Sequence, residues 1–181
     1  MTDTFNEAFK NVNDNTLIYE DITKNIVNEY VGDLDELIRD FNADVVQGDA
    51  DDRILEKYLF ELGNKLYFLS EKLEQVGIRD DISKMLYKEE YNTQYLANRE
   101  KDSDKKNKLT VAELTAIAET NSKEHQIINS LYSRVYSQIK MRMSAGYDLV
   151  SSIRKIITKR MQDQNLSFSI PSAPTTYGTL E

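Results

Sequence analysis

The chain has 181 residues, enough for one domain or for one domain with an appendage. It has no cysteine and a single histidine, His125, which excludes disulfides, thiolate metal sites and most histidine-based catalysis. No stretch reaches the roughly 18 consecutive apolar residues of a membrane span, and the N-terminus is acidic and polar. We therefore expect a soluble cytoplasmic protein without a membrane partner.

The net charge of −8 hides an asymmetry along the chain. Residues 1–52 hold 14 acidic and 3 basic residues, whereas residues 125–162 hold 7 basic residues and one acid, Asp148. A chain polarised in this way can offer a basic face to phosphates, or it can dock its own acidic half there. Both interpretations stay open at this point.

Apolar residues at helical spacing predict two helices in an acidic N-terminal arm, residues 1–50. The first runs over residues 16–31 and ends at Gly32, and the second runs over 33–46 and ends at Gly48. Residues 1–14 are expected to form a loose helical turn or to stay unstructured. The acidic residues at 48–52 resemble a calcium-binding loop. The third ligand position is Arg53, however, and the central glycine is absent. We therefore expect these acidic residues to cap the next helix.

The helical bundle is predicted to span residues 51–162. Its first helix covers about 52–76 and stops at Gly77, and the next, capped by Asp80 or Asp81, runs to about residue 99. A row of tyrosines on that helix favours packing, with base stacking as the alternative: Tyr87, Tyr91 and Tyr95. The lysine-rich stretch 101–108 is expected to be a solvated turn, although its lysines could reach phosphates.

A long basic helix is predicted over residues 110–162. It opens on Thr110-Val-Ala-Glu113, the pattern of a capping box. Its apolar seam has the spacing of helix-on-helix or subunit-on-subunit packing and comprises Ile128, Tyr132, Val135, Ile139, Leu149, Ile153 and Ile156. Arg142 and Gly146 interrupt the seam, which predicts two packing zones, 128–139 and 149–156. Gly146 would permit a close approach or a bend, and Arg142 requires a partner.

Residues 163–181 alternate apolar and polar side chains over 165–170 and then carry two prolines, which favours an extended or disordered tail. The fold class expected for the whole chain is all-α, an elongated helical bundle with one long C-terminal helix, a coiled-coil-like seam and a flexible tail. Phosphate-binding glycine loops, metalloprotease motifs and nucleophile elbows are all missing. The sequence therefore predicts a non-enzyme without cofactor or metal.

The last two helices resemble the UvsY-type recombination mediators of tailed bacteriophages. The resemblance rests on Leu86–Arg99, on the Glu-Leu…Ala-Glu entry at Thr110–Glu119, and on Ser130–Met161 with its Ile153-Arg-Lys-Ile156 and Lys159-Arg160 cluster. It covers about half of the chain and leaves out the acidic arm and the tail. It implies a small helical protein that self-assembles, binds single-stranded DNA and assists a recombinase in the host cytoplasm.

Under this hypothesis the basic residues of the long helix contact phosphates: Lys140, Arg142, Arg154, Lys155, Lys159 and Arg160. The seam would hold the homo-oligomer together. The alternative is a structural or assembly protein of a phage particle that works through helix–helix oligomerisation, other virion proteins and the C-terminal tail. A third hypothesis makes the acidic arm an inhibitor or DNA mimic.

Overall fold

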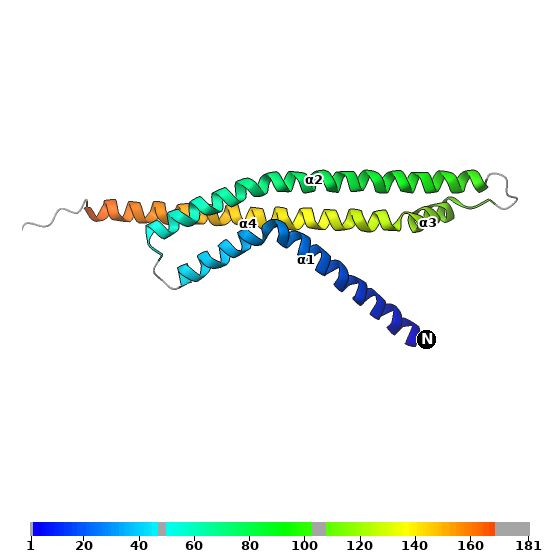
Figure 1. Cartoon of the computed structure of the whole chain (residues 1–181), viewed down its shortest axis with the longest axis horizontal. Coiled ribbons are helices and arrows are strands. Elements are labelled where there is room, and N and C mark those ends of the chain that lie inside the picture. Colours follow the sequence, from blue (N-terminus) through cyan, green and yellow to red (C-terminus); the bar gives the residue numbers. More distant parts are fainter. Residues whose placement is uncertain (1, 47–49, 103–107, 169–181) are drawn as a thin grey trace, which may run out of the picture.

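The computed structural model describes the backbone of residues 2–46, 50–102 and 108–168, and the side chains of 17–45, 50–101 and 108–164. The described residues form four helices: α1 (Thr2–Val46), α2 (Asp52–Asp102), α3 (Val111–Asn121) and α4 (Lys123–Phe168). Helices α2 and α4 lie side by side and build a rod, α3 packs near one end of α2, and α1 crosses α4 and then runs away from the rod (Figure 1). The all-α, elongated bundle predicted from the sequence is confirmed.

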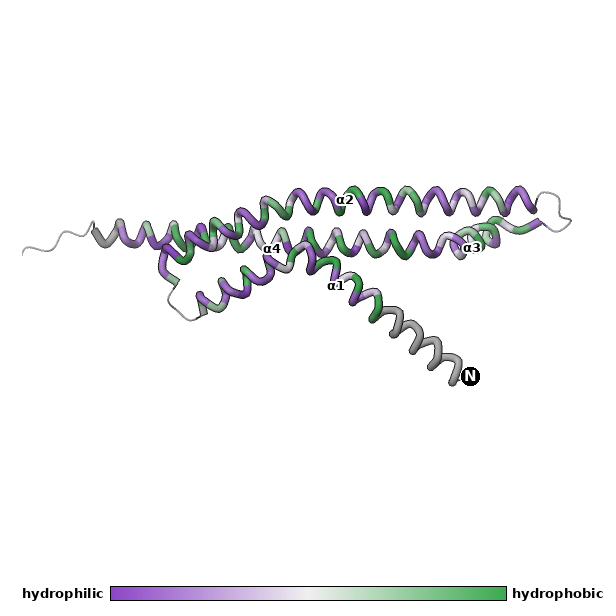
Figure 2. The backbone as a smooth tube through the Cα atoms, in the orientation of Figure 1, coloured by the Kyte–Doolittle hydropathy of each residue, from purple (hydrophilic) through white to green (hydrophobic). Residues whose placement is uncertain are grey.

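The core is a narrow seam where three helices meet. Hydrophobic positions recur along each of the long helices (Figure 2), as expected for helices that bury one side. Each fully buried aliphatic side chain contributes roughly 1.5–3 kcal/mol relative to an exposed one. The most deeply buried of these side chains are Val31 from α1, Leu55, Leu62, Leu66 and Val76 from α2, and Val135, Ile139 and Ile153 from α4.

The predicted helix ends at Gly32 and Gly77 are wrong, because α1 and α2 each continue through the glycine. A glycine inside a helix costs only about 1 kcal/mol relative to alanine. Buried side chains next to each glycine outweigh that cost: Val31 and Leu34 flank Gly32, and Val76 precedes Gly77. Two predicted pairs of helices therefore become two long helices.

The predicted single helix over residues 110–162 is also wrong, because it is broken at Ser122. The Ser122 N–H donates to the Ala118 carbonyl at 3.0 Å, and the Ser122 hydroxyl donates to the same oxygen at 2.8 Å. The Ser122 carbonyl accepts from the Gln126 N–H at 3.1 Å and so starts α4. The break lies in the backbone of this fully buried serine, whose φ of −93° and ψ of 7° depart from helical values, so α3 ends before it and α4 begins after it.

The capping box at the start of α3 is confirmed. The Thr110 hydroxyl accepts from the Glu113 N–H at 3.3 Å, and the Glu113 carboxylate accepts from the Thr110 N–H at 2.7 Å. The bond from the Thr110 N–H, followed by a bond that the Thr110 hydroxyl donates to the same carboxylate at 2.9 Å, lowers the pKa of Glu113. At the start of α2, the Asp51 carboxylate accepts from the Ile54 N–H at 2.8 Å, which confirms the capping role predicted for this acidic stretch.

Asp80 is buried inside α2, so its predicted role as a helix cap is wrong. Its carboxylate accepts a hydrogen bond from the Ser133 hydroxyl of α4 at 2.5 Å and pairs with Lys84 at 2.6 Å. Burial by itself raises the pKa of Asp80, but the hydrogen bonds from Lys84 and Ser133, with the Lys84 charge, bring it below its ordinary value. A charged group thus fixes the position of α4 against α2.

The extended segment predicted at 165–170 is wrong over residues 165–168, which belong to α4. The rest of the predicted tail, 169–181, lies outside the described residues, as do residues 103–107 of the lysine-rich stretch.

Candidate nucleic-acid interface

The six basic residues predicted to contact DNA are all exposed on α4, but they do not form one patch. Arg154, Lys155 and Lys159 lie within two turns near the C-terminal end of the helix. Lys140 lies about 20 Å before them at the 1.5 Å rise per residue of an α-helix, with its ammonium 6.0 Å from the Tyr136 ring centroid. The remaining two arginines face acids of the N-terminal half.

Arg142 and Arg160 are the two engaged arginines. Arg142 forms an ion pair with Asp35 of α1, and Arg160 pairs with Asp52 at 3.0 Å and donates to the Ala50 carbonyl at 2.9 Å. The two arginines are 18 residues apart, which is about five helical turns, so both lie on one side of α4. The acidic half of the chain therefore covers one side of the basic helix and leaves other sides open.

The Arg142–Asp35 pair holds α1 against α4, and its strength can be predicted. The side chains are 48% and 28% exposed, so solvent screens the pair. A double-mutant cycle with Arg142→Ala and Asp35→Ala should give a coupling of about 0.2–1 kcal/mol in urea unfolding. The matched cycle with Arg154→Ala in place of Arg142→Ala should give none. Equal coupling in both cycles would contradict a specific contact.

A second group of basic residues shares the side of α4 that faces away from the buried Val150 and Ile153. It consists of Lys155 and Lys159 from the predicted set, together with Lys123 and Arg134, which the sequence reasoning missed. On a helix with 3.6 residues per turn the four lie within about 60° of one another. All four are exposed, and none makes an ion pair with another described residue. We call this group the basic line.

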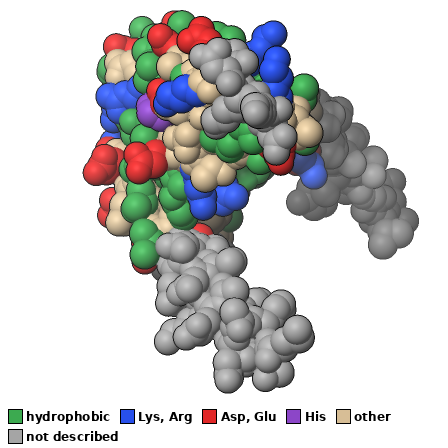
Figure 3. Space-filling view, turned by 90° about the vertical axis from the view of Figure 1, so that its right-hand side faces the viewer, with side chains coloured by type: hydrophobic (Ala, Val, Ile, Leu, Met, Phe, Trp, Pro, Cys, Tyr) green, Lys and Arg blue, Asp and Glu red, His purple; other side chains and the backbone are tan. Residues whose placement is uncertain are grey.

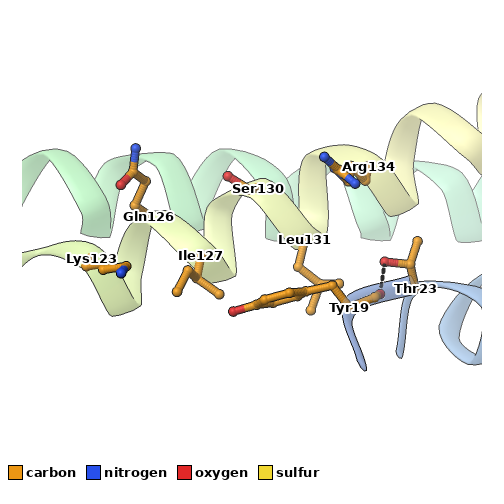
Figure 4. A pocket seen from close by; sticks show the side chains of 8 residues that line it. All are labelled: Tyr19, Thr23, Lys123, Gln126, Ile127, Ser130, Leu131 and Arg134. Atoms are coloured by element: carbon orange, nitrogen blue, oxygen red, sulfur yellow. Dashed lines mark hydrogen bonds between the residues drawn. The ribbon is translucent and has the colours of Figure 1, made fainter. Parts of the chain in front are cut away.

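The first half of the basic line borders a groove between α1 and α4 with a volume of about 250 Å³. The Tyr19 ring from α1 lies beside Ile127 and Leu131 of α4, while Lys123 and Arg134 stand at opposite ends (Figure 4). An aromatic face next to cations is the combination that proteins use to hold single-stranded nucleic acid. The 11-residue spacing of the two bases, three helical turns, was visible in the sequence. The contribution of Tyr19 was not visible in the sequence, because it depends on how α1 crosses α4.

The residues of the predicted oligomerisation seam lie mostly inside the chain. Val135, Ile139 and Ile153 are fully buried against the other helices, and Tyr132 and Leu149 are half-buried. Only Ile128 and Ile156, at 47% and 42% exposure, retain substantial surface. The two predicted packing zones are joined rather than separate, because Gly146 between them is buried against Leu66 and Leu34. The seam therefore packs helix on helix within one copy.

The tyrosine row on α2 is half-buried and its rings contact one another. The ring centroids of Tyr87 and Tyr91, and of Tyr91 and Tyr95, are each 6.4 Å apart. This end of the rod carries acidic, basic and apolar side chains close together, with no field of one sign (Figure 3). Mutual contact between the rings fits the packing interpretation.

The described residues contain no cluster of three or more side chains suited to hold a metal ion. No described helix combines the length and the apolar character that crossing a membrane requires. Comparisons with protein-family models, with characterised proteins and with solved structures find no match for the chain.

Proposed function

We propose that the chain is a phage-type accessory protein that self-assembles and binds single-stranded DNA to assist a recombinase. The observation that carries the proposal is the basic line of Lys123, Arg134, Lys155 and Lys159, which stays exposed although the chain as a whole is acidic. Phosphate contacts from such residues provide affinity without reading sequence.

The geometry of the basic line suits an extended strand. Lys123 and Lys159 are 36 residues apart on one helix, which is about 54 Å at 1.5 Å per residue. The Tyr19 groove lies at one end of the line and offers a ring against which a base can stack. Arg142 and Arg160 contribute less to this interface than the sequence predicted, because Asp35 and Asp52 already neutralise them.

Fluorescence anisotropy with a labelled single-stranded oligonucleotide tests the proposal. Binding should weaken steeply between about 50 mM and about 200 mM salt, because each phosphate contact to a single strand adds about 0.7 to the slope of log affinity against log salt. Replacing all four residues of the basic line with alanine should reduce that slope by about 3.

Lys88→Ala provides a control, because Lys88 is an exposed lysine on α2, away from the basic line. It should leave both affinity and slope nearly unchanged. Absence of binding by the unmodified protein at about 50 mM salt would overturn the proposal, since electrostatic binding is strongest there. If the salt dependence of the variant with four alanines is unchanged, the DNA does not contact the basic line.

The alternative, a structural or assembly protein of a phage particle, has one observation in its favour. Large apolar side chains stand exposed on α2, on the side away from α4, including Phe60, Tyr67 and Met85. Extended apolar surface of this kind typically marks a protein–protein interface. Under this alternative the protein forms a defined oligomer that is indifferent to DNA.

A further inference from the structure

Helix α2 is apolar on two opposite sides. One side packs into the core through Leu62, Leu66 and Leu69. The other carries eight large apolar side chains that are about half exposed or more, which we call the outer stripe: Phe60, Tyr67, Phe68, Ile78, Ile82, Met85, Leu86 and Leu96. Core packing explains the first side and leaves the second without a function inside the chain.

The outer stripe follows one side of α2 in segments, because the exposed Glu71 and Glu89 lie on the same side between its apolar residues. Phe60, Ile78 and Leu96 are 18 residues apart, about five turns of 3.6 residues, so they lie on the same side of α2. Tyr67 and Met85 have the same 18-residue spacing and lie beside them. A stripe that follows one side of a helix has the shape that another helix can cover.

The area of the outer stripe matches what a stable interface needs. Aromatic side chains bury about 150–250 Å² each when fully covered, so eight large side chains at half exposure or more present on the order of 900 Å². A standard interface buries about 800 Å² per partner.

The charge of α2 favours a second copy of the same helix as the partner. Helix α2 holds nine basic and eleven acidic residues, close to neutral. Helix α1 holds three basic and eleven acidic residues, and α4 holds eight basic and three acidic residues. Copies of α1 or of α4 would repel each other along their length, whereas two copies of α2 would not. In a two-fold symmetric pair the same surface, here the outer stripe, forms the interface on both copies.

We propose that two copies of this chain associate by packing the outer stripe of α2 against the outer stripe of the other copy. The interface deepens the self-assembly in the proposed function and rests on that part of it. It moves self-association from the α4 seam, which is covered within each chain, to the opposite side of the rod. The basic lines on the α4 helices then remain free on the outside of the pair.

Sedimentation velocity on the full chain tests this interface. The unmodified protein should sediment as a dimer or a larger assembly at about 10 μM, a concentration that populates any association with a Kd near 1 μM. The double variant Ile82→Glu, Met85→Glu should sediment as a monomer, because it places two charges in the apolar contact. Since both side chains are at least half exposed, circular dichroism should show unchanged helix content.

Met141→Glu is the matched control, because Met141 is as exposed as Met85, at 69%, but lies on α4. It should associate like the unmodified protein. A monomeric unmodified protein would overturn the proposal and assign the stripe to a different partner protein. An assembly that persists in the double variant would also overturn it.

Crosslinking provides a second readout that does not depend on stability. The chain has no cysteine, so single cysteines at positions 78, 82 and 85 can be joined only between copies. A short bis-maleimide should give covalent dimers with at least one of them, and none with Met141→Cys. Anisotropy on the same samples separates the two proposals: DNA binding that fails in an intact dimer counts against the proposed DNA function alone, and a monomer that binds DNA counts against this interface alone.

Discussion

Replacing Gly146 with valine is expected to lower the free energy of unfolding by about 3 kcal/mol, the upper part of the range for overpacking a core. Gly146 is buried where three helices meet. A Cβ added there would come within 2.8 Å of Leu66 Cδ2 and 3.6 Å of Leu34 Cδ2. Leu66 is only 1% exposed, so its side chain has little space into which to move. Helices α1, α2 and α4 would have to separate.

Gly63→Val is the matched comparison, because Gly63 is exposed in α2 and a Cβ added there meets no atom within 4 Å. It should change stability by no more than about 0.5 kcal/mol. Urea unfolding followed by circular dichroism at one fixed protein concentration measures both variants. Equal losses at the two glycines would contradict close packing at Gly146 and would indicate a general effect of valine on helix stability.

Replacing Asp80 with alanine is expected to destabilise the fold by about 1–3 kcal/mol, the usual cost of leaving a buried hydrogen-bonding group without its partner. The change removes the acceptor of the Ser133 hydroxyl and the counter-ion of Lys84. Asp81→Ala is the control: Asp81 is adjacent in sequence but its side chain is 80% exposed. A loss at Asp81 as large as that at Asp80 would contradict the role assigned to the buried contact.

Asp80 also predicts a pH dependence of stability. Its pKa in the folded protein lies below the ordinary value of 3.8, so the unfolded chain binds a proton more readily. The stabilisation that ionised Asp80 gives to the folded protein is therefore complete above the pKa of Asp80 in the unfolded chain. It is lost as the pH falls through the pKa of Asp80 in the folded protein. Between about pH 5 and about pH 3, Asp80→Asn should lose less stability than the unmodified protein. Parallel pH profiles would contradict the lowered pKa.

Two capping signals in the sequence predicted local structure correctly. The Thr110–Glu113 capping box needs only residues three apart, and the cap at Asp51 likewise involves its near neighbour Ile54. Helical periodicity predicted the all-α class because it reports which side of each helix is buried. Features formed by segments far apart in the chain were not accessible in this way.

The missed features depend on which helix packs against which. Gly77 looked like a helix end, but α2 continues through it and α4 places Tyr136 3.2 Å from where a Cβ would stand. Ser122 carries no breaker signal, yet it divides the predicted helix. Asp80 resembled a cap because aspartate is a preferred N-cap residue, and only the position of Ser133, 53 residues later, makes it a buried partner. The acid facing Arg142 was likewise unpredictable, because Asp35 is 107 residues away.

The pairing of α2 with α4 brings together residues at steadily increasing distance along the chain. Next to α3, Ser83 contacts Asn129 across 46 residues, then Asp80 contacts Ser133 across 53, and at the far end Asp52 contacts Arg160 across 108. Each doubling of a loop adds about 0.6 kcal/mol to the entropy cost of closing it. Contacts at the α3 end therefore have the lowest entropy cost of loop closure and should form first. Each contact then shortens the loop that the next contact has to close. The rod should consequently fold as a zipper that starts at the α3 turn and closes last where Arg160 meets Asp52.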